Sequence, residues 1–276
     1  MNYCFMRFPD FKRKAVTLSY DDGMIFDKKL IEIMDKNGLK GTFNIDSGLF
    51  SEDGKRRMTQ SQAVELYTNS GHEVAVHGKE HLPLGHIPTA MAIADILNDR
   101  IALENLFGTI ISGMAYAYGS YSKEVVDMLE SIGIEYARTT SHTERFELPA
   151  NWLGLSATCH HGNPKLMELA RAFVEEKPSQ YYWGRSPKMF YLWGHSYEFN
   201  DGNCWHIIEQ FAEYIGNRED IWYATNIEIC RYAKAYKALK FSADGKWAYN
   251  PTAIDIYLEY FEEEILVKSG ETKKLK

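Results

Sequence analysis

Two adjacent aspartates, Asp21 and Asp22, follow an apolar, β-type run over residues 15–20 and precede Gly23. Neighbouring carboxylates at the exit of a buried strand each disfavour ionisation of the other. A metal ion resolves this conflict, because one acid binds the ion while the other remains free to move a proton. The pair therefore predicts a metal site whose remaining ligands come from elsewhere in the chain.

Nitrogen ligands are available in the segment HGKEH, which contains His77 and His81. The same segment matches a peptidase signature, H-x-x-E-H, in which a helix presents both histidines and Glu80 acts as the base. Residues 73–76 are strand-like, and Gly78 disfavours a helix by about 1 kcal/mol relative to alanine. We therefore expect a loop leaving a strand, with Glu80 facing outward, and keep the peptidase as the less favoured alternative.

The elements that must position these residues alternate between short β-type runs and helical patterns. Seven or eight β/α units predict an α/β fold with a mainly parallel sheet and helices outside it. The first strand is not followed by GxGxxG, which disfavours a dinucleotide-binding domain. We predict a distorted (β/α) TIM-like barrel of about seven parallel strands over residues 1–240. The expected strands cover residues 15–20, 41–45, 73–76, 113–117, 136–139, 153–158, 188–193 and 221–224.

Residues 241–276 differ in character from the preceding units. Two short β-type runs, 246–250 and 256–260, predict a C-terminal β extension packed on the barrel. We identify no internal repeat and no linker, so the barrel and this extension form the expected organisation.

Further reactive side chains fall where the expected strands end. They are Tyr118, Arg138, His160, His161 and His195. Parallel strands of a barrel point the same way, so these side chains should gather at the carboxyl face, where barrel active sites are built. A single histidine is usually structural, but several at the same end of one sheet favour a functional site.

Composition limits the classes of partner. The hydrophobic fraction of 45% and the charged fraction of 25% are typical of globular proteins. A net charge of −7 argues against a nucleic-acid surface. Four scattered cysteines without a CxxC pair predict neither a disulfide framework nor a cysteine zinc site. The first residues lack a signal-peptide core, and no apolar run reaches membrane-span length. We expect a cytoplasmic protein with no membrane partner; its oligomeric state stays open.

Four segments occur in the order found in the polysaccharide deacetylase (NodB-homology) family, which residues 15–230 resemble. They are YDDG at 20–23, HGKEH at 77–81, YG at 118–119 and LWGH at 192–195. The resemblance implies a distorted (β/α) barrel and metal-dependent removal of N-acetyl, or sometimes O-acetyl, groups from a carbohydrate. On matching positions it implies that Asp21 is the catalytic base and His195 the general acid. It further implies that the metal ligands are Asp22, His77 and His81.

These roles form a coherent mechanism. Two histidines and one aspartate leave open positions on a divalent ion, as in catalytic zinc sites. The same ligands accept Co, Ni or Mn, with zinc the expected ion. Metal binding lowers the pKa of a bound water from 15.7 towards about 7, so hydroxide is available at neutral pH. Asp21 would take the proton from that water. A backbone N–H near Tyr118 and Gly119 would stabilise the oxyanion by roughly 3 kcal/mol. His195 would protonate the departing amine.

The sequence also departs from the family pattern. The family usually has an arginine four residues before Gly119, where this chain has Ala115. Arg138, at the exit of the next strand, is our candidate for the missing guanidinium; the alternative is a structural salt bridge. The family's Asp-rich fourth motif is not recognisable. His160 is predicted to line the substrate site, or one of His160 and His161 to orient His195.

Three functions remain distinct at this point. The favoured one is deacetylation of a carbohydrate, with Trp193 either stacking on a sugar or simply packing. The second is hydrolysis of a small non-sugar amide, as in the allantoinase-like branch of the superfamily. The third is a catalytically weak sugar-binding barrel that has lost turnover with the missing arginine. The retained base Asp21 and acid His195 argue against the third. The expected partner is therefore a carbohydrate or a small acetylated substrate.

Overall fold

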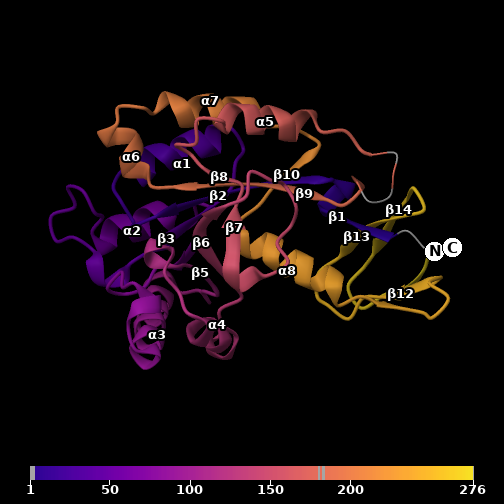
Figure 1. The fold of residues 1–276 in the computed structure, drawn as a ribbon, viewed down its shortest axis with the longest axis horizontal. Coiled ribbons are helices and arrows are strands. Elements are labelled where there is room, and N and C mark those ends of the chain that lie inside the picture. The colour runs from indigo at the N-terminus through magenta and orange to yellow at the C-terminus, as the bar shows by residue number, and fades with distance from the viewer. Residues whose placement is uncertain (1–3, 180, 182–183, 276) are drawn as a thin grey trace.

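A computed structural model describes residues 4–179, 181 and 184–275. Its centre is a parallel sheet with the strand order β7-β6-β5-β4-β3-β2-β9-β8, in which β10 also pairs with β2 (Figure 1). The strands are β2 Lys14–Asp21, β3 Gly41–Ile45, β4 Glu73–Val76, β5 Gly113–Ala115, β6 Tyr136–His142, β7 Leu155–Ala157, β8 Cys159–His160, β9 Lys188–Gly194 and β10 Ile221–Tyr223.

The sheet closes through one segment that pairs with two neighbours. β7 pairs with β6, whereas β8 pairs with β9, and only Thr158 separates β7 from β8. The expected strand over 153–158 is therefore shortened to β7, because its first residues form a 3-10 turn and Thr158 already bonds to β9. Counting β7 and β8 together, seven segments surround the barrel, with β10 beside the start of β2. The predicted α/β barrel of about seven parallel strands is confirmed.

Helices cover the outside of the sheet, and α1, α5 and α7 lie together on one side of it (Figure 1). The helix over 60–67 begins with the capping box that Thr59 and Gln62 predict, and Thr225 with Glu228 forms a second box before α8. The helices are α1 Asp27–Lys36, α2 Gln60–Tyr67, α3 Thr89–Phe107, α4 Lys123–Leu129, α5 Leu166–Glu175, α6 Ser196–Asp201, α7 His206–Ile215 and α8 Asn226–Lys237. Short 3-10 turns lie at Pro9–Phe11, Ser47–Leu49, Leu84–His86, Ala117–Gly119, Glu130–Ile132 and Trp152–Gly154.

Both ends of the chain contribute antiparallel strands outside the barrel. β1 (Cys4–Arg7) pairs with β13 (Ile256–Tyr260), which also pairs with β14 (Glu263–Val267). β11 (Lys240–Phe241), β12 (Trp247–Tyr249) and β15 (Thr272–Lys274) form a second small sheet. Two of these strands match the runs expected after residue 240, whereas the partnership with β1 was not foreseen. The division into 1–240 and 241–276 stays a prediction. Within the described residues, no helix combines the length and apolarity needed to cross a bilayer.

A buried carboxyl, Glu73, ties the start of α8 to the inside of the barrel. It accepts hydrogen bonds from the backbone N–H of Ile227 (2.9 Å) and from the hydroxyls of Thr42 (2.8 Å) and Tyr136 (2.8 Å). Burial nevertheless dominates and raises the pKa of Glu73 from 4.5 to about 7. The protein therefore folds around a carboxyl that holds its proton in mildly acidic solution.

This raised pKa predicts a pH dependence of stability. Between about pH 4.5 and 7 folded Glu73 binds more protons than unfolded Glu73, so its contribution to the free energy of unfolding falls as pH rises. The loss is of order 1 kcal/mol per pH unit. We expect Glu73→Gln, which mimics the protonated form, to be less sensitive to pH in urea unfolding across this window. The exposed Glu264→Gln serves as control, and equal slopes for wild type and Glu73→Gln would contradict the prediction.

Candidate metal centre and active site

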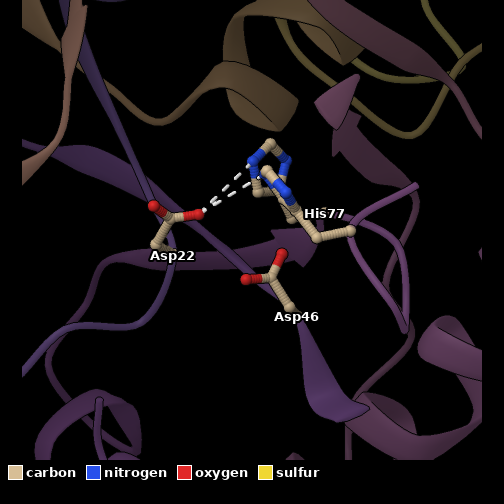
Figure 2. Close-up of side chains that lie close together, drawn as sticks. Asp22, Asp46 and His77 are labelled. Carbon is tan, nitrogen blue, oxygen red and sulfur yellow. Dashed lines mark ion pairs between the residues drawn. The ribbon is translucent and has the colours of Figure 1, made fainter. Parts of the chain in front are cut away.

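The carboxyl ends of β2, β3 and β4 bring four potential metal ligands together. They are Asp22, Asp46, His77 and His81, and one ligand atom of each lies within 4.8 Å of the others. Oδ1 of Asp22 lies 3.8 Å from Nε2 of His77 and 3.6 Å from Nε2 of His81. Figure 2 shows Asp22, Asp46 and His77 close together, with ion pairs of Asp22 marked by dashed lines. The three expected ligands thus lie at one site.

The donor set fits a divalent cation. Oδ1 of Asp22 and Oδ1 of Asp46 are buried and have no hydrogen-bond partner among the described residues, a costly state that a bound cation relieves. Nδ1 of His77 lies 2.9 Å from the carbonyl oxygen of Ala115, which only accepts, so Nδ1 carries the proton. Nε2 of His77 then presents a lone pair towards Asp22. Such a backbone contact is the usual way in which a metal-binding histidine is oriented.

The backbone at the ligands is held in an unusual conformation. Asp22 has φ of 82° and His81 has φ of 51°, in the left-handed region that costs non-glycine residues of order 1 kcal/mol. Residues 77–81 form a loop and not a helix, and Glu80 is exposed. The expected loop is confirmed, and the peptidase alternative fails because its helix is absent from this segment.

Asp99 on α3 fixes this loop from behind. Its buried carboxylate accepts the backbone N–H groups of His77 and Gly78 at one oxygen (3.0 Å each) and that of Ser47 at the other (2.7 Å). Ser47 directly follows Asp46, so one side chain anchors the loops after β3 and β4. Sequence reasoning missed Asp99 because it lies in the middle of a helix, far from any strand exit.

We expect Asp99→Asn to weaken divalent-metal binding by about 10- to 100-fold, the usual range for residues that orient ligands. An amide nitrogen cannot accept either set of backbone N–H groups, so one loop must lose its anchor. Calorimetric titration of the metal-free protein with Zn²⁺ measures the change. Asp127→Asn, at an exposed ion pair on α4, is the matched control. Equal affinities for wild type and Asp99→Asn would show that the loops hold their shape unaided.

Asp46 and Arg57 form a charged edge of the metal group that the sequence analysis did not include. Nη1 of Arg57 donates to Oδ2 of Asp46 (2.7 Å) and to the carbonyl oxygen of Asp22 (2.9 Å). Burial raises the pKa of Asp46 to about 7, although the charges of His77 and Arg57 oppose this. Asp46 follows a strand exit like the other candidates, so the same rule would have found it. Arg57 comes from an irregular segment and carries no such signal.

Asp21, the expected base, is buried beside the metal group. Oδ1 accepts from the amide of Asn44 (2.8 Å), and Oδ2 forms an ion pair with Arg138. Oδ2 also lies 3.8 Å from Nε2 of His77 and 3.9 Å from Nε2 of His195. Burial opposes ionisation, but the charges of Arg138, His77 and His195 outweigh it and hold the pKa of Asp21 below its ordinary value. Asp21 is therefore ionised at neutral pH.

Arg138 occupies the position that Ala115 leaves empty. The two residues are direct partners in the parallel pairing of β5 with β6. Register partners present their side chains on the same face of a sheet. Arg138 therefore places its guanidinium at the level of Ala115, but on the neighbouring strand. Its other face lies over the ring of Trp193, 4.4 Å from the ring centre. The hypothesis that Arg138 supplies the missing guanidinium to Asp21 agrees with this geometry.

The residues expected near the substrate differ in their accessibility. Trp193 is only 8% exposed and packs on Arg138, which supports the packing interpretation over sugar stacking. Tyr118 has φ of 58°, is 68% exposed and places its ring 4.5 Å from that of His81. The N–H of Gly119 donates to the carbonyl of Tyr116 (2.8 Å). That amide is used within its turn, which leaves only the Tyr118 amide for the expected oxyanion role.

His195, the expected acid, lies in a cluster of histidines. His160 ends β8, His161 follows it, and both lie with His195 around Glu198, the first-turn acid of α6. Burial disfavours protonation of His195, but contact with Glu198 and the charges of Asp21 and Asp22 prevail and raise its pKa above 6.5. The predicted acid is thus placed opposite the predicted base.

The fold and the site define a (β/α) barrel with a candidate metal centre at its carboxyl face. A family model described as polysaccharide deacetylase matches residues 9–137. None of the curated proteins compared with the chain matches it. Through these residues, just under half of its length, the chain is similar to the polysaccharide deacetylase family.

Solved structures of the family share the fold. A Mycobacterium smegmatis protein with the same family name has a TM-score of 0.58 and 18% identity, over 83% of this chain and 93% of that one. A family 4 carbohydrate esterase from Streptomyces lividans, in complex with acetate, has a TM-score of 0.51 and 14% identity, over 77% and 93%. A family 4 pseudoenzyme from Bacillus anthracis has a TM-score of 0.51 and 13% identity, over 82% and 68%. At these identities the likeness shows the fold alone.

Proposed function

We propose that this chain is a metal-dependent hydrolase that removes acetyl groups from an N- or O-acetylated carbohydrate. One observation carries the proposal: Oδ2 of Asp21 lies 3.8 Å from the ligand His77 and 3.9 Å from Nε2 of His195. Base, acid and metal ligands therefore surround one small space at the carboxyl face. The match of residues 9–137 to the polysaccharide deacetylase family model supports the assignment of the reaction.

Asp22, His77 and His81 would hold the ion, with Asp46 beside them. A bound divalent cation, zinc being our first choice before Co, Ni or Mn, supplies a water of lowered pKa and polarises the acetyl carbonyl. The protein's own residues do the rest. Asp21, kept ionised by Arg138, takes the proton of the attacking water. His195 protonates the leaving amine or alcohol from Nε2.

A protein without turnover is the second candidate, and one observation favours it. A Bacillus anthracis relative of the same fold is a pseudoenzyme, so this barrel also occurs without activity. The base, the acid and the ligands are all present in this chain, and Arg138 supplies the guanidinium that Ala115 does not. These residues favour the enzyme.

We propose a cytoplasmic location for the protein.

Acetate release tests the proposal. Purified protein loaded with Zn²⁺ should release acetate from N-acetylglucosamine oligomers or from an acetylated xylan. Asp21→Asn should retain the metal and lose turnover by about 10²-fold or more, because it lacks only the base. Sugar binding without acetate would favour the non-catalytic candidate. Release of ammonia or another amine from a small amide, with no acetate from either polymer, would point to the non-sugar hydrolase.

A further inference from the structure

Three histidines surround a single carboxylate beside the proposed active site. Oε2 of Glu198 lies 3.1 Å from Nε2 of His160 and 2.9 Å from Nε2 of His161. Oε1 lies 3.4 Å from Nδ1 of His195. Among the described residues, neither Nδ1 of His195 nor Oε2 of Glu198 has a partner that meets hydrogen-bond geometry. These ion pairs are therefore the polar contacts that the buried atoms make.

His160, His161 and Glu198 lie close enough together to hold a metal ion, but the proton positions argue against one. Nδ1 of His160 accepts the backbone N–H of Gly162 (3.1 Å). A nitrogen that accepts is unprotonated, so in the neutral ring Nε2 carries the hydrogen and has no lone pair to offer. That nitrogen lies 3.1 Å from Oε2 of Glu198, so its hydrogen is on the side of the carboxylate. The cluster is thus organised around the carboxylate as acceptor.

The chain places Glu198 one helical turn after His195. α6 begins at Ser196, and the i,i+3 spacing returns the Glu198 carboxylate to the Nδ1 side of the imidazole. Nε2 of the same ring is left on the side of Asp21, 3.9 Å from its carboxylate. The two ring nitrogens therefore face two different carboxylates.

Resting on the proposed function, we propose that Glu198 is the positioning residue of the acid His195, and that His160 and His161 hold Glu198 in place. Glu198 accepts the Nδ1–H of the imidazolium and so presents the Nε2–H to the leaving group. In the step itself the bond between the acetyl carbon and the leaving atom breaks, and that atom takes the proton from Nε2. The ring ends neutral, still with its hydrogen on Nδ1, and no proton moves to Glu198.

The charges around His195 are consistent with this role. Burial opposes ionisation of Glu198, but its contacts with His160, His161 and His195 prevail and hold its pKa well below the ordinary range. The titratable groups that face His195 are Asp21 and Asp22 at the end of β2, Tyr197 and Glu198 on α6, and His160 and His161 at the end of β8. Burial lowers the pKa of His161, which keeps it a neutral donor to the carboxylate.

Glu198→Gln tests the proposal, because it removes the charge and keeps the shape. We expect kcat for acetate release to fall by about 10- to 100-fold with KM and metal content unchanged. The alkaline limb of kcat against pH should move to lower pH, since the imidazolium loses its partner. Glu198→Asp should recover part of the rate. Glu144→Gln is the matched control: Glu144 is also 34% exposed and ion-paired, with Lys165.

A second readout does not need turnover. NMR titration of the His195 ring should give a lower pKa in Glu198→Gln, by roughly one pH unit or more, and no change in Glu144→Gln. If wild type releases no acetate but this shift appears, the proposed function fails and the positioning role stands. The role of Glu198 would be overturned if Glu198→Gln left the pKa of His195 or the alkaline limb of kcat unchanged. It would also be overturned if wild type bound a second metal ion that Glu198→Gln lost.

Discussion

Arg138→Ala is expected to reduce acetate release by about 10²-fold or more and to destabilise the fold. Its guanidinium is the closest counter-charge of the buried carboxylate of Asp21. Removing one partner of a buried ion pair leaves an uncompensated charge and typically costs about 3–5 kcal/mol. The pKa of Asp21 should rise, so the acid limb of the pH–rate profile should move to higher pH.

The sign of the stability effect follows from the same pair. An aspartate with a depressed folded pKa contributes stability above its unfolded pKa and loses this contribution as pH falls. The difference in unfolding free energy between wild type and Arg138→Ala should therefore be largest near neutral pH and shrink in acid. Denaturant unfolding at several pH values measures it. A constant difference would mean that the variant loses packing against Trp193 and not charge.

The strand register offers a sharper control. Because Ala115 and Arg138 are direct partners on β5 and β6, the double variant Ala115→Arg/Arg138→Ala returns a guanidinium to the same level of the sheet. We expect this double variant to regain part of the lost rate. The acid limb of its pH–rate profile should return part of the way to the wild-type pH. Wild-type activity in Arg138→Ala alone would show that Asp21 needs no arginine.

Asp22→Ala is expected to abolish high-affinity metal binding and, with it, detectable turnover. The carboxylate oxygen that faces both histidines disappears, and the two imidazoles and the proton-holding carboxyl of Asp46 remain. A ligand that binds only the folded state stabilises it by about 4 kcal/mol at a thousand times its dissociation constant. Zn²⁺ should therefore raise the Tm of wild type and leave that of Asp22→Ala almost unchanged.

The metal-free proteins should behave in the opposite way. Without the cation, wild type contains the buried, unpartnered Oδ1 of Asp22, which alanine lacks. Asp22→Ala should then be at least as stable as wild type after chelation, although alanine adopts the left-handed φ of 82° no more easily. Asp127→Ala on the surface of α4 is the control. A metal-dependent rise in Tm that survives in Asp22→Ala would remove Asp22 from the ligand set.

The strand-exit rule explains what could be predicted from the sequence. Asp21, Asp22, His77 and His195 each follow a β-type run, and parallel topology alone brings them to one face. Glu198 and Arg57 escaped this reasoning. Glu198 reaches the site through a turn of helix after His195, and Arg57 reaches it from an irregular segment whose path depends on tertiary packing.

The barrel itself was predictable in kind but not in its closure. Residues 153–158 have the pattern of one strand. That pattern does not predict that β7 pairs with β6 whereas the adjoining β8 pairs with β9. Likewise the pairing of β1 with β13 joins segments about 250 residues apart, which no local pattern encodes. The oxyanion role predicted for the Gly119 amide shows that tertiary detail was also not predictable. This amide donates to the carbonyl of Tyr116 within a turn that the sequence did not reveal.

The two halves of the site are assembled by strand pairings of very different sequence separation. The metal ligands lie between residues 22 and 81 on three consecutive strands, so a short stretch of chain assembles them. The proposed acid, His195, needs β9 against β2, a pairing that spans more than 170 residues, and β8 against β9. Pairings of such sequence separation carry a high loop-closure cost and slow folding. The segment that closes the barrel also carries His160 and His161, so the proposed acid His195 gains its histidine neighbours only when the ring of strands is complete.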